Sequence, residues 1–341
     1  MELSSHETMH EKIKLGISSC LLGEQVRYDG GHKLDRFITD TLGQYFEWVP
    51  VCPEFECGLP IPREPLHLVG SPESPRLITS RTGIDHTEKM LQWAENKLGE
   101  LEQENLCGFI FKSKSPSSGI SGVKVHTLSG IPIKRGIGIF GGAFMKRFPL
   151  TPVIDDGRLH NPQLRENFIE TVFVFQRWQK IQKSRSISDL VEFHSSHKLL
   201  MLAHSPRHYA ALGQLVAGAK RVKRETLFSA YIKGFMEGMS LLATPKKNAN
   251  VLMHISGYFK KLNSSDERQE LLEVIENHRK CLIPLIVPIT LVKHYVRKYT
   301  VPYLQKQYYL NPHPMELKDS NLLFDWPEST PGAGQRQRNV R

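Results

Sequence analysis

Short apolar runs alternate with amphipathic stretches along the first half of the chain. Residues 86–106, HTEKMLQWAENKLGELEQENL, carry apolar side chains at helical spacing and predict a helix that begins near Asp85 or Thr87. The apolar runs predict three strands and a weaker fourth: KLGISSCLL (14–22, with its exit loop), FEWVPVC (46–52), LCGFIFKS (106–113) and VKVHTL (123–128). Strands separated by helices favour a mainly parallel sheet with crossover connections. We therefore expect a Rossmann-like α/β domain over residues 1–160.

The pattern changes in the second half. Glycine, proline and aspartate are dense in GIFGGAFMKRFPLTPVIDDGRLHNPQL (138–164), which predicts a loop or domain boundary. RENFIETVFVFQRWQKIQ (165–182) then predicts a long helix, and KSRSIS (183–188) predicts a linker that ends in a helix cap. Helical spacing continues in five further stretches: SDLVEFHSSHKLLMLAH, RHYAALGQLVAGAK, RETLFSAYIKGFMEGMSLLA, VLMHISGYFKKL and SDERQELLEVIENHRK. We expect an all-helical domain over 161–320. A disordered tail should follow over 321–341, where PESTPGAGQRQRNVR has no core-forming residues.

Charge separates the two halves further. The chain has 341 residues, 40% of them hydrophobic, which is enough for two ordinary domains. Residues 1–180 contain 21 Lys+Arg and 22 Asp+Glu, a net of −1, whereas residues 181–341 contain 24 and 13, a net of +11. An excess of positive charge confined to one half indicates a polyanionic partner or an anionic substrate. A solvated basic face without a partner is the alternative.

The compartment follows from what the sequence lacks. Its beginning, MELSSHETMHEKIK, is polar and does not resemble a signal peptide, and no apolar run reaches the roughly 18 residues of a membrane span. We therefore expect a soluble cytoplasmic protein with no membrane partner. Five cysteines, an odd count, are then thiols, metal ligands or buried small residues rather than disulfides.

Candidate chemistry gathers at the ends of the predicted strands. Cys20 and Cys52 each follow a strand, as does the segment SPSSG, and Glu54 lies two residues after Cys52. The carboxyl ends of parallel strands meet at one edge of the sheet, so these residues should converge. A cysteine beside a carboxylate is a plausible metal ligand with an acid/base group. Each cysteine taken alone is more commonly a buried, inert residue.

Long, ordered motifs carry a family resemblance. GISSCLLG…VRYDG, VCPE…GLP…PR, TGIDHT and KSKSPSSG closely resemble the thiouracil desulfidase family, formerly a domain of unknown function, over roughly residues 12–155. The second half resembles the helical domain of unknown function that is fused to it in YbgA-like proteins. The motifs that carry this second resemblance are FHSSHKLLMLAH (193–204), NVLMHISGYFKK (250–261) and PLIVPITLVKHYV (284–296).

The first resemblance implies a cofactor and a reaction. Active family members hold a [4Fe–4S] cluster on three cysteines, which leaves one iron open to bind the sulfur of a thiocarbonyl while water attacks the carbon. Cys20 and Cys52 match two ligand positions. Glu54 matches the catalytic acid/base residue, and Ser115 matches a serine at the site of reaction. The remaining matches imply substrate contacts from Arg27, Tyr28, Asp29, Ser113 and Ser117.

The third ligand position departs from the family. The family pattern ends S-P-S-C-G, whereas this chain has Ser118 in place of the cysteine. A serine hydroxyl is a harder donor than a cysteine thiol. It is also far less acidic than a free thiol, whose pKa is about 8.5. Ser118 could ligate as an alkoxide, or Cys57 could replace it. Otherwise the cluster is absent or labile. Cys107 is a poorer substitute because it begins its predicted strand.

Two functions remain open from the sequence. The leading one is a desulfidase-like enzyme that acts on a thiolated nucleobase or related thioamide, with Ser118 replacing the third cysteine. The alternative is a non-catalytic nucleobase- or RNA-binding protein that uses the same pocket. Basic and aromatic residues interleave in KRVKRE (220–225) and HYVRKYTVPYLQKQYY (294–309), a pattern that suits RNA, although no complete RNA-binding signature is present.

Histidines in the second half give a further metal-site hypothesis. His194 and His197 are three residues apart on one predicted helix and share a face, which would allow them to ligate a metal. His204 lies two turns further, and His254 and His294 are on other predicted helices. Ordinary packing and capping by these histidines is the alternative. A second departure from the fused family lies at residues 248–250, where Asn-Ala-Asn lacks a histidine.

Overall fold

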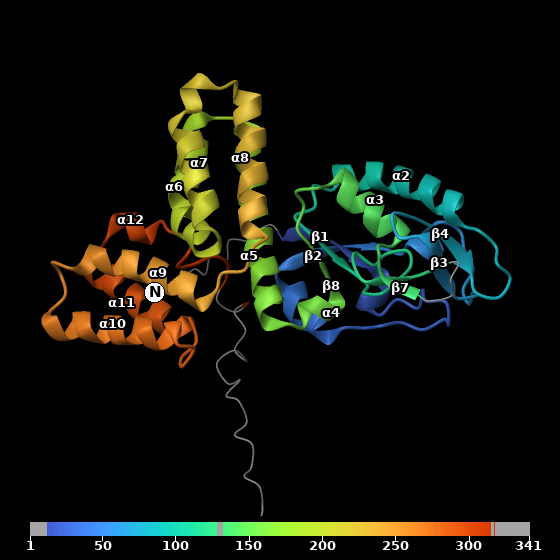
Figure 1. Ribbon diagram of the computed structural model, residues 1–341, viewed down its shortest axis with the longest axis horizontal. Coiled ribbons are helices and arrows are strands. Elements are labelled where there is room, and N and C mark those ends of the chain that lie inside the picture. The colour runs from blue at the N-terminus through green and yellow to red at the C-terminus, as the bar shows by residue number, and fades with distance from the viewer. Residues whose placement is uncertain (1–11, 128–131, 315–316, 318–341) are drawn as a thin grey trace, which may run out of the picture.

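The computed structural model describes residues 12–127, 132–314 and 317, so the tail predicted over 321–341 lies outside the described residues. Figure 1 shows an α/β part on the right, a helical part on the left, and helix α5 (Pro162–Ser184) between them. The α/β architecture of the first half and the helical architecture of the second confirm the predicted fold class.

The first sheet is parallel throughout. Its strands lie in the order β2-β1-β5-β8, with bounds β1 (Ile13–Ser18), β2 (Phe46–Val51), β5 (Phe109–Phe111) and β8 (Val153–Asp155). The first three confirm the strands predicted from the apolar runs. Side chains alternate between the two faces of the sheet. Leu15 and Ile110 share a core with α5, whereas Phe109 and Phe111 pack on the other face against the helices α2 (Thr87–Gln103) and α3 (Ile139–Arg147).

A glycine in β1 makes room for that aromatic layer. A Cβ at Gly16 would lie 2.1 Å from the ring of Phe109, far inside van der Waals contact. The Phe109 ring in turn stacks on Phe111 with centroids 4.0 Å apart. The missing side chain therefore lets the central strand pass beneath the ring.

A second, mixed sheet was not predicted. Its order is β4-β3-β6-β7, and only β3 and β6 run parallel: β3 (Leu66–Ser71), β4 (Ser74–Thr79), β6 (Val123–His126) and β7 (Pro132–Gly136). The weaker fourth strand of the prediction is real as β6, but it was wrongly placed in the parallel sheet. Leu68, Leu77 and Val125 cover Met90 of α2, so this sheet packs through its own small core.

The glycine- and proline-rich stretch 138–164 is not the loop that its composition predicts. It contains α3, the edge strand β8 and the short helix α4 (Asp156–Leu159). Its glycines serve close packing: a Cβ at Gly138 would lie 2.6 Å from the backbone of Ser117, and one at Gly141 would lie 2.7 Å from the Ser118 carbonyl oxygen. Small residues here bring the start of α3 against the loop that follows β5.

Several short elements complete the α/β part. They are the 3-10 helices η1 (Ser19–Leu22) and η3 (Leu42–Gln44), the π-helix η2 (Phe37–Thr41) and the α-helix α1 (Pro53–Glu56). The short helix η1 follows strand β1, and the short helix α1 follows strand β2. They therefore carry the residues that leave the carboxyl edge of the parallel sheet.

The helical part follows α5 as expected. The linker between the two helices is shorter than the predicted 183–188, and the helix cap comes two residues before its predicted end: the Ser186 hydroxyl accepts a hydrogen bond from the Asp189 amide. The longer helices are α6 (Ile187–His204), α7 (Pro206–Ala217), α8 (Arg224–Met239), α9 (Pro245–Ser256), α10 (Ser265–Arg279) and α11 (Ile286–Tyr299), and the short ones are η4 (Ala219–Arg221), η5 (Gly257–Phe259) and α12 (Pro302–Gln305). Among the described residues, no helix has the length and apolar character to cross a membrane.

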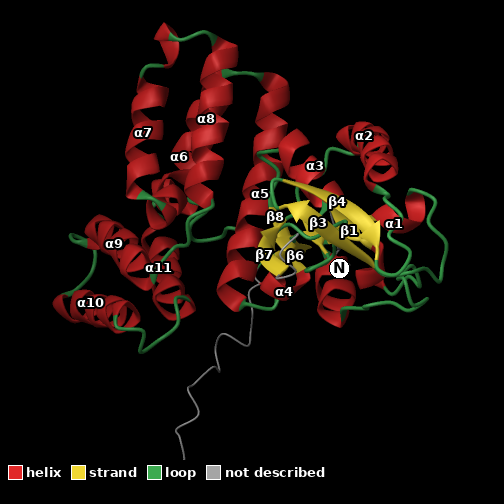
Figure 2. Cartoon of the chain, turned by 45° about the vertical axis from the view of Figure 1, so that its right-hand side comes forward, coloured by secondary structure: helices red, strands yellow, loops and turns green. Residues whose placement is uncertain are grey.

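One apolar core joins the two parts. It contains Leu15 of β1, Val172 and Trp178 of α5, Tyr231 of α8 and Leu310 near the end of the described chain. Figure 2 shows α5 standing between the strands and the helices α6–α8. A buried helix with apolar residues around most of its circumference can face two neighbours at once, and α5 does so.

Candidate functional site

A cavity of about 330 Å³ opens at the carboxyl edge of the parallel sheet. Cys20 in η1 follows β1, Cys52 caps α1 after β2, and Ser118 lies in the loop after β5, and all three line this cavity. Three segments distant in sequence thus place their donors in one wall, as predicted from the strand ends. These three residues lie close together because the strands that precede them, β2, β1 and β5, are neighbours in the sheet.

Both cavity cysteines are protonated thiols at neutral pH. They are 9% and 7% exposed, and burial, helped by the charge of Glu54, raises the pKa of Cys20 to about 11 and that of Cys52 to about 12. The Cys52 Sγ lies 3.7 Å from a carboxylate oxygen of Glu54 and 3.8 Å from the Val26 carbonyl oxygen. A metal bound here would have to displace the two protons.

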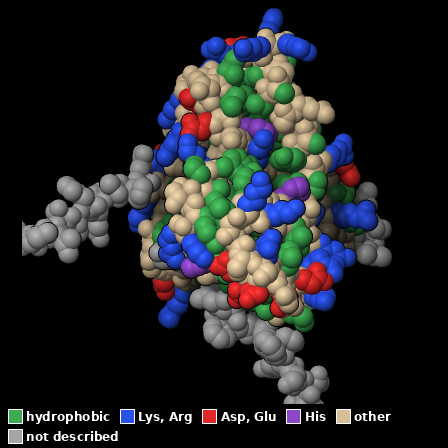
Figure 3. Space-filling view, turned by 90° about the vertical axis from the view of Figure 1, so that its left-hand side faces the viewer, with side chains coloured by type: hydrophobic (Ala, Val, Ile, Leu, Met, Phe, Trp, Pro, Cys, Tyr) green, Lys and Arg blue, Asp and Glu red, His purple; other side chains and the backbone are tan. Residues whose placement is uncertain are grey.

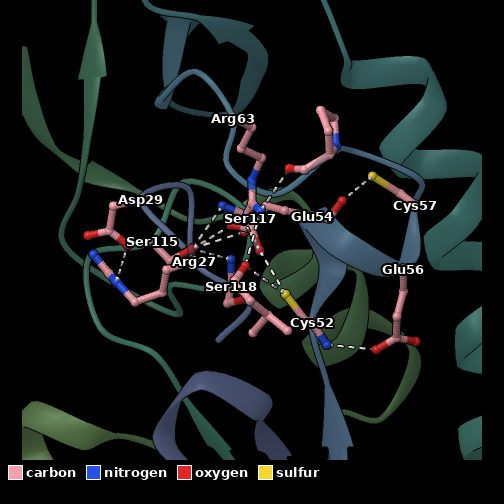
Figure 4. Close-up of polar contacts among 12 residues, drawn as sticks. Arg27, Asp29, Cys52, Glu54, Glu56, Cys57, Arg63, Ser115, Ser117 and Ser118 are labelled. Atoms are coloured by element: carbon pink, nitrogen blue, oxygen red, sulfur yellow. Dashed lines mark hydrogen bonds and ion pairs between the residues drawn. The ribbon is translucent and has the colours of Figure 1, made fainter. Parts of the chain in front are cut away.

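Glu54 is the carboxylate at the centre of the site. Its Oε1 accepts hydrogen bonds from the Ser117 hydroxyl and, at 3.5 Å, from the Ser115 hydroxyl. Its Oε2 lies 3.8 Å from a guanidinium nitrogen of Arg63, whose side chain is itself buried. Figure 4 shows these groups converging beside the Cys52 sulfur. A carboxylate with fixed donors and a neighbouring cation is positioned to take up and return a proton.

The loop after β5 is held in place by its own hydrogen bonds. The Ser115 hydroxyl accepts from the backbone amides of Ser117 at 3.3 Å and Ser118 at 3.1 Å. The Gly138 amide, at the start of α3, donates to the Gly119 carbonyl oxygen at 2.7 Å. Ser118 is only 3% exposed, so its position in the cavity wall is set by the backbone rather than by solvent.

Cys57 does not join the other two cysteines. Its Sγ lies 3.3 Å from the Glu54 carbonyl oxygen and packs with Leu59, Leu68 and Met90 in the core beneath the second sheet. Figure 4 shows its sulfur directed at the Glu54 carbonyl oxygen, apart from the Cys52 sulfur, and it does not line the cavity. The structure therefore does not support the hypothesis that Cys57 replaces the third ligand, and that hypothesis stays a prediction. The short helix α1 lies between the two cysteines and directs the Cys57 side chain into the core beneath the second sheet.

The predicted substrate contacts divide into two groups. Arg27, Tyr28 and Ser113 line the cavity. Asp29 does not, and instead pairs with Arg27 at 3.6 Å from a half-exposed position. Ser117 is fully buried behind the wall, where it donates to Glu54, so it holds the carboxylate rather than facing the cavity.

A lysine–aspartate pair was missed by the sequence reasoning. Lys112 lines the cavity, and its Nζ lies 2.7 Å from a carboxylate oxygen of Asp156, which also accepts from the Ser113 amide at 2.6 Å. Burial opposes ionisation of Asp156, but the Lys112 ammonium lowers the pKa of that carboxyl overall. The signal was present: Asp156 directly follows β8, the fourth strand to end at this edge.

His194 and His197 do not form a metal site. The Nδ1 of His194 lies 3.1 Å from the Tyr231 hydroxyl, and Arg177 donates through Nε to the Nε2 of His197 at 3.0 Å. Burial lowers the pKa of both rings, that of His194 to about 4. A guanidinium against the second ring leaves no place for another cation. His254 and His294 are exposed on α9 and α11.

The basic and aromatic stretches separate in space. Lys220, Arg221 and Lys223 are exposed at the turn between α7 and α8, where Figure 3 shows Lys and Arg side chains gathered at the top of the molecule. Tyr295 and Tyr309 are 2% and 5% exposed, so those two rings pack in the core and cannot stack on bases. The exposed charges remain available to a polyanion.

Comparisons with known proteins give different matches for the first and second halves of the chain. A family model described as 2-thiouracil desulfurase matches residues 15–156, and one described as a protein of unknown function, DUF1722, matches residues 198–314. The uncharacterized protein YbgA of Escherichia coli K12 is 34% identical over 137 residues, which are 39% of this chain and 81% of YbgA. The uncharacterized protein YbbK of Bacillus subtilis 168 is 32% identical over 119 residues, 33% of this chain and 78% of YbbK. A solved structure described as the [4Fe–4S]-dependent thiouracil desulfidase TudS is 30% identical, with a TM-score of 0.37, and covers 44% of this chain and 95% of its own.

Proposed function

Because this chain belongs to the family of YbgA-like proteins and carries a 2-thiouracil desulfurase domain in its first half, we propose that it removes sulfur from a small thiolated nucleobase or related thioamide. In this reaction water replaces the sulfur: the C=S carbon gains the water oxygen, the C–S bond breaks, and hydrogen sulfide leaves with both protons. The observation that carries the proposal is the shared cavity of Cys20, Cys52, Ser118 and Glu54.

The donor set fits an iron–sulfur cluster with mixed ligands. Two thiols and one hydroxyl reach the cavity from three segments, and Lys112, Arg27 and Arg63 surround it with positive charge that suits an anionic cluster. Thiolates are the usual ligands, but other donors replace some of them in Rieske centres. We therefore assign Cys20, Cys52 and Ser118 to hold a [4Fe–4S] cluster, whose open iron would act as a Lewis acid toward the thiocarbonyl sulfur.

The cavity walls bind and orient the substrate. Tyr28 offers a partly exposed ring, with the Arg27 guanidinium 5.4 Å from its centroid, which suits stacking by a planar base. Lys112 and Ser113 line the same cavity and carry hydrogen-bond donors that suit carbonyl and ring-nitrogen acceptors. We propose that these groups hold a flat heterocycle with its thiocarbonyl near the two cysteines.

Glu54 supplies the proton transfers. Because its Oε2 lies 3.7 Å from the Cys52 sulfur, the carboxylate stands beside the position where the substrate sulfur would bind. It can take a proton from the attacking water and return it to the departing sulfur. Ser115 and Ser117 fix its other oxygen, and Arg63 stabilises its negative charge.

Ser118 itself favours the second function. If two thiols and a hydroxyl retain no cluster, the same cavity still offers a stacking ring and donors for a nucleobase. The exposed basic residues of the second half would add affinity for a phosphate backbone. This non-catalytic alternative predicts binding of a nucleobase or RNA without release of sulfide.

The decisive experiment is anaerobic purification of the full chain, followed by iron and sulfide analysis, EPR spectra and measurement of sulfide release from 2-thiouracil. We expect close to four irons per chain and turnover. A Glu54→Gln variant should keep its iron and lose about 10²–10⁴-fold in kcat. The same change at the exposed Glu24 is the matched control and should leave turnover unaltered.

Two outcomes would contradict different parts of the proposal. Iron-free protein that still binds 2-thiouracil or RNA would establish the non-catalytic alternative. Full iron content with unchanged turnover in Glu54→Gln would keep the cluster but remove Glu54 from the reaction.

A further inference from the structure

A second cluster of metal-type ligands lies in the helical part, and none of its residues lines the cavity. Glu166 and Glu170 stand one turn apart on α5, and His313 follows α12 near the end of the described chain. One ligand atom from each of the three lies within 4.8 Å of the others. His204, the last residue of α6, contacts Glu170 through its Nε2 at 3.2 Å.

Both histidine rings are oriented as metal ligands are. The Nδ1 of His313 lies 2.9 Å from the Pro314 carbonyl oxygen, and the Nδ1 of His204 lies 2.7 Å from the Leu241 carbonyl oxygen. A carbonyl oxygen only accepts, so each Nδ1 carries a proton. The Nε2 of each ring then presents a lone pair if the ring is neutral. Metal-binding histidines are commonly fixed in this way, with the second nitrogen donating to a backbone carbonyl.

Each Nε2 faces a carboxylate oxygen. The Nε2 of His313 lies 2.8 Å from Glu166, just as that of His204 lies near Glu170. The two rings are 0% and 1% exposed in their side chains, and the carboxylates are 27% and 16% exposed. A lone pair against a carboxylate is repulsive unless a cation lies between them or the ring is protonated.

Two arrangements fit these contacts. Protonated rings would pair with the glutamates as separate ion pairs, whereas one divalent ion would bind a neutral His313 ring and both carboxylates. The grouping suits the ion, because one turn of α5 places both carboxylates beside the same imidazole, within reach of a single cation. Ligand atoms around a tetrahedral ion with bonds of about 2.1 Å are about 3.4 Å apart, a spacing within the 4.8 Å that spans the ligand atoms of Glu166, Glu170 and His313.

We propose that Glu166, Glu170 and His313 bind one divalent transition-metal ion of the zinc class, with His204 holding Glu170 in position. A ligand set that includes an imidazole suits such an ion better than magnesium or calcium, which prefer oxygen ligands throughout. This proposal does not depend on the function of the first cavity.

The ion would fasten two distant segments together. Glu166 and Glu170 lie between the two segments matched by the family models, whereas His313 lies within the DUF1722 match. Near the same place, Arg177 of α5 donates to the Pro312 carbonyl oxygen at 3.0 Å. Metal binding would therefore hold the last described segment against α5, which is a structural role.

The test uses the full chain stripped with a chelator and then titrated with Zn²⁺. We expect one equivalent of zinc to be lost in Glu166→Gln and in His313→Gln. We also expect Zn²⁺ at a hundredfold excess over its Kd to raise Tm by roughly 5 °C in the unaltered protein but not in these variants. Glu273→Gln and His254→Gln change the same residue types at exposed sites and should behave as the unaltered protein.

The cysteine cavity could also take up zinc, so a Cys20→Ser Cys52→Ser variant separates the two sites. With Co²⁺ it should keep visible bands of a four-coordinate nitrogen/oxygen site without thiolate-to-cobalt charge transfer. This variant also decides the question if the glutamate or histidine variants fail to fold. Absence of those bands, or a Zn²⁺ response equal in the unaltered protein and Glu166→Gln, would overturn the proposal and leave two ion pairs.

Discussion

Ser118 sets the chemistry of the cavity more than any other residue. It lines the same cavity as two thiols, yet a hydroxyl binds iron more weakly than a thiolate because it is harder and far less acidic. The cysteines and Glu54 could be predicted from sequence because each follows a strand. The direction of Cys57 could not, since it depends on one turn of α1. Asp156 escaped notice because β8, which positions it, spans only Val153–Asp155.

Ser118→Cys should preserve the iron and sulfide content of the anaerobic protein and slow the loss of both in air, because it completes a set of three thiolates. Cys57→Ala is the paired test, and it should leave iron content unchanged because this side chain packs in the separate core. Iron analysis and EPR spectra of the anaerobic proteins measure both. Loss of iron in Cys57→Ala would mean that α1 rearranges when the cluster binds.

At the scale of elements, predictions succeeded where burial follows a simple period. The parallel strands are apolar runs, and α2 and α5 show helical spacing over many residues. The hairpin β3–β4 was missed because its strands have few buried positions, such as Leu68 and Leu77, and little apolar alternation. The helix α3 was missed because its glycines were taken as loop formers, although they serve the contact with the Ser118 loop.

Gly141→Ala should disturb the cavity without changing any of its functional groups. The new Cβ would lie 2.7 Å from the Ser118 carbonyl oxygen, so α3 or the loop must shift, at a cost of roughly 1–3 kcal/mol. Gly142→Ala is the matched control, because its Cβ meets only the Ile137 side chain at 3.4 Å and gains helix propensity. The free energy of unfolding measured with denaturant and the iron content should both fall in Gly141→Ala and not in Gly142→Ala. Equal behaviour of the two would show that the loop adapts freely.

At the scale of the whole molecule, the two parts differ in charge but share a core. The net of −1 in residues 1–180 and +11 in 181–341 was readable from the sequence. The shared core was not, because helical spacing in α5 does not say how many neighbours the helix has. The cluster of Glu166 and His313 was equally hidden, since 147 positions separate the two residues.

Shared burial predicts that the chain unfolds as one unit. The ring of Phe173 on α5 lies 6.0 Å from that of Phe46 in β2 and 5.9 Å from that of His313, so it contacts both parts. Phe173→Ala should cost about 2 kcal/mol, less than a fully buried phenylalanine, and should lower one common transition. Hydrogen exchange across a denaturant series would show whether there is one transition. We expect the amides of β5 and α8 to lose protection together. Loss of protection in α8 while β5 stays protected would instead mean that α5 joins two independent folding units.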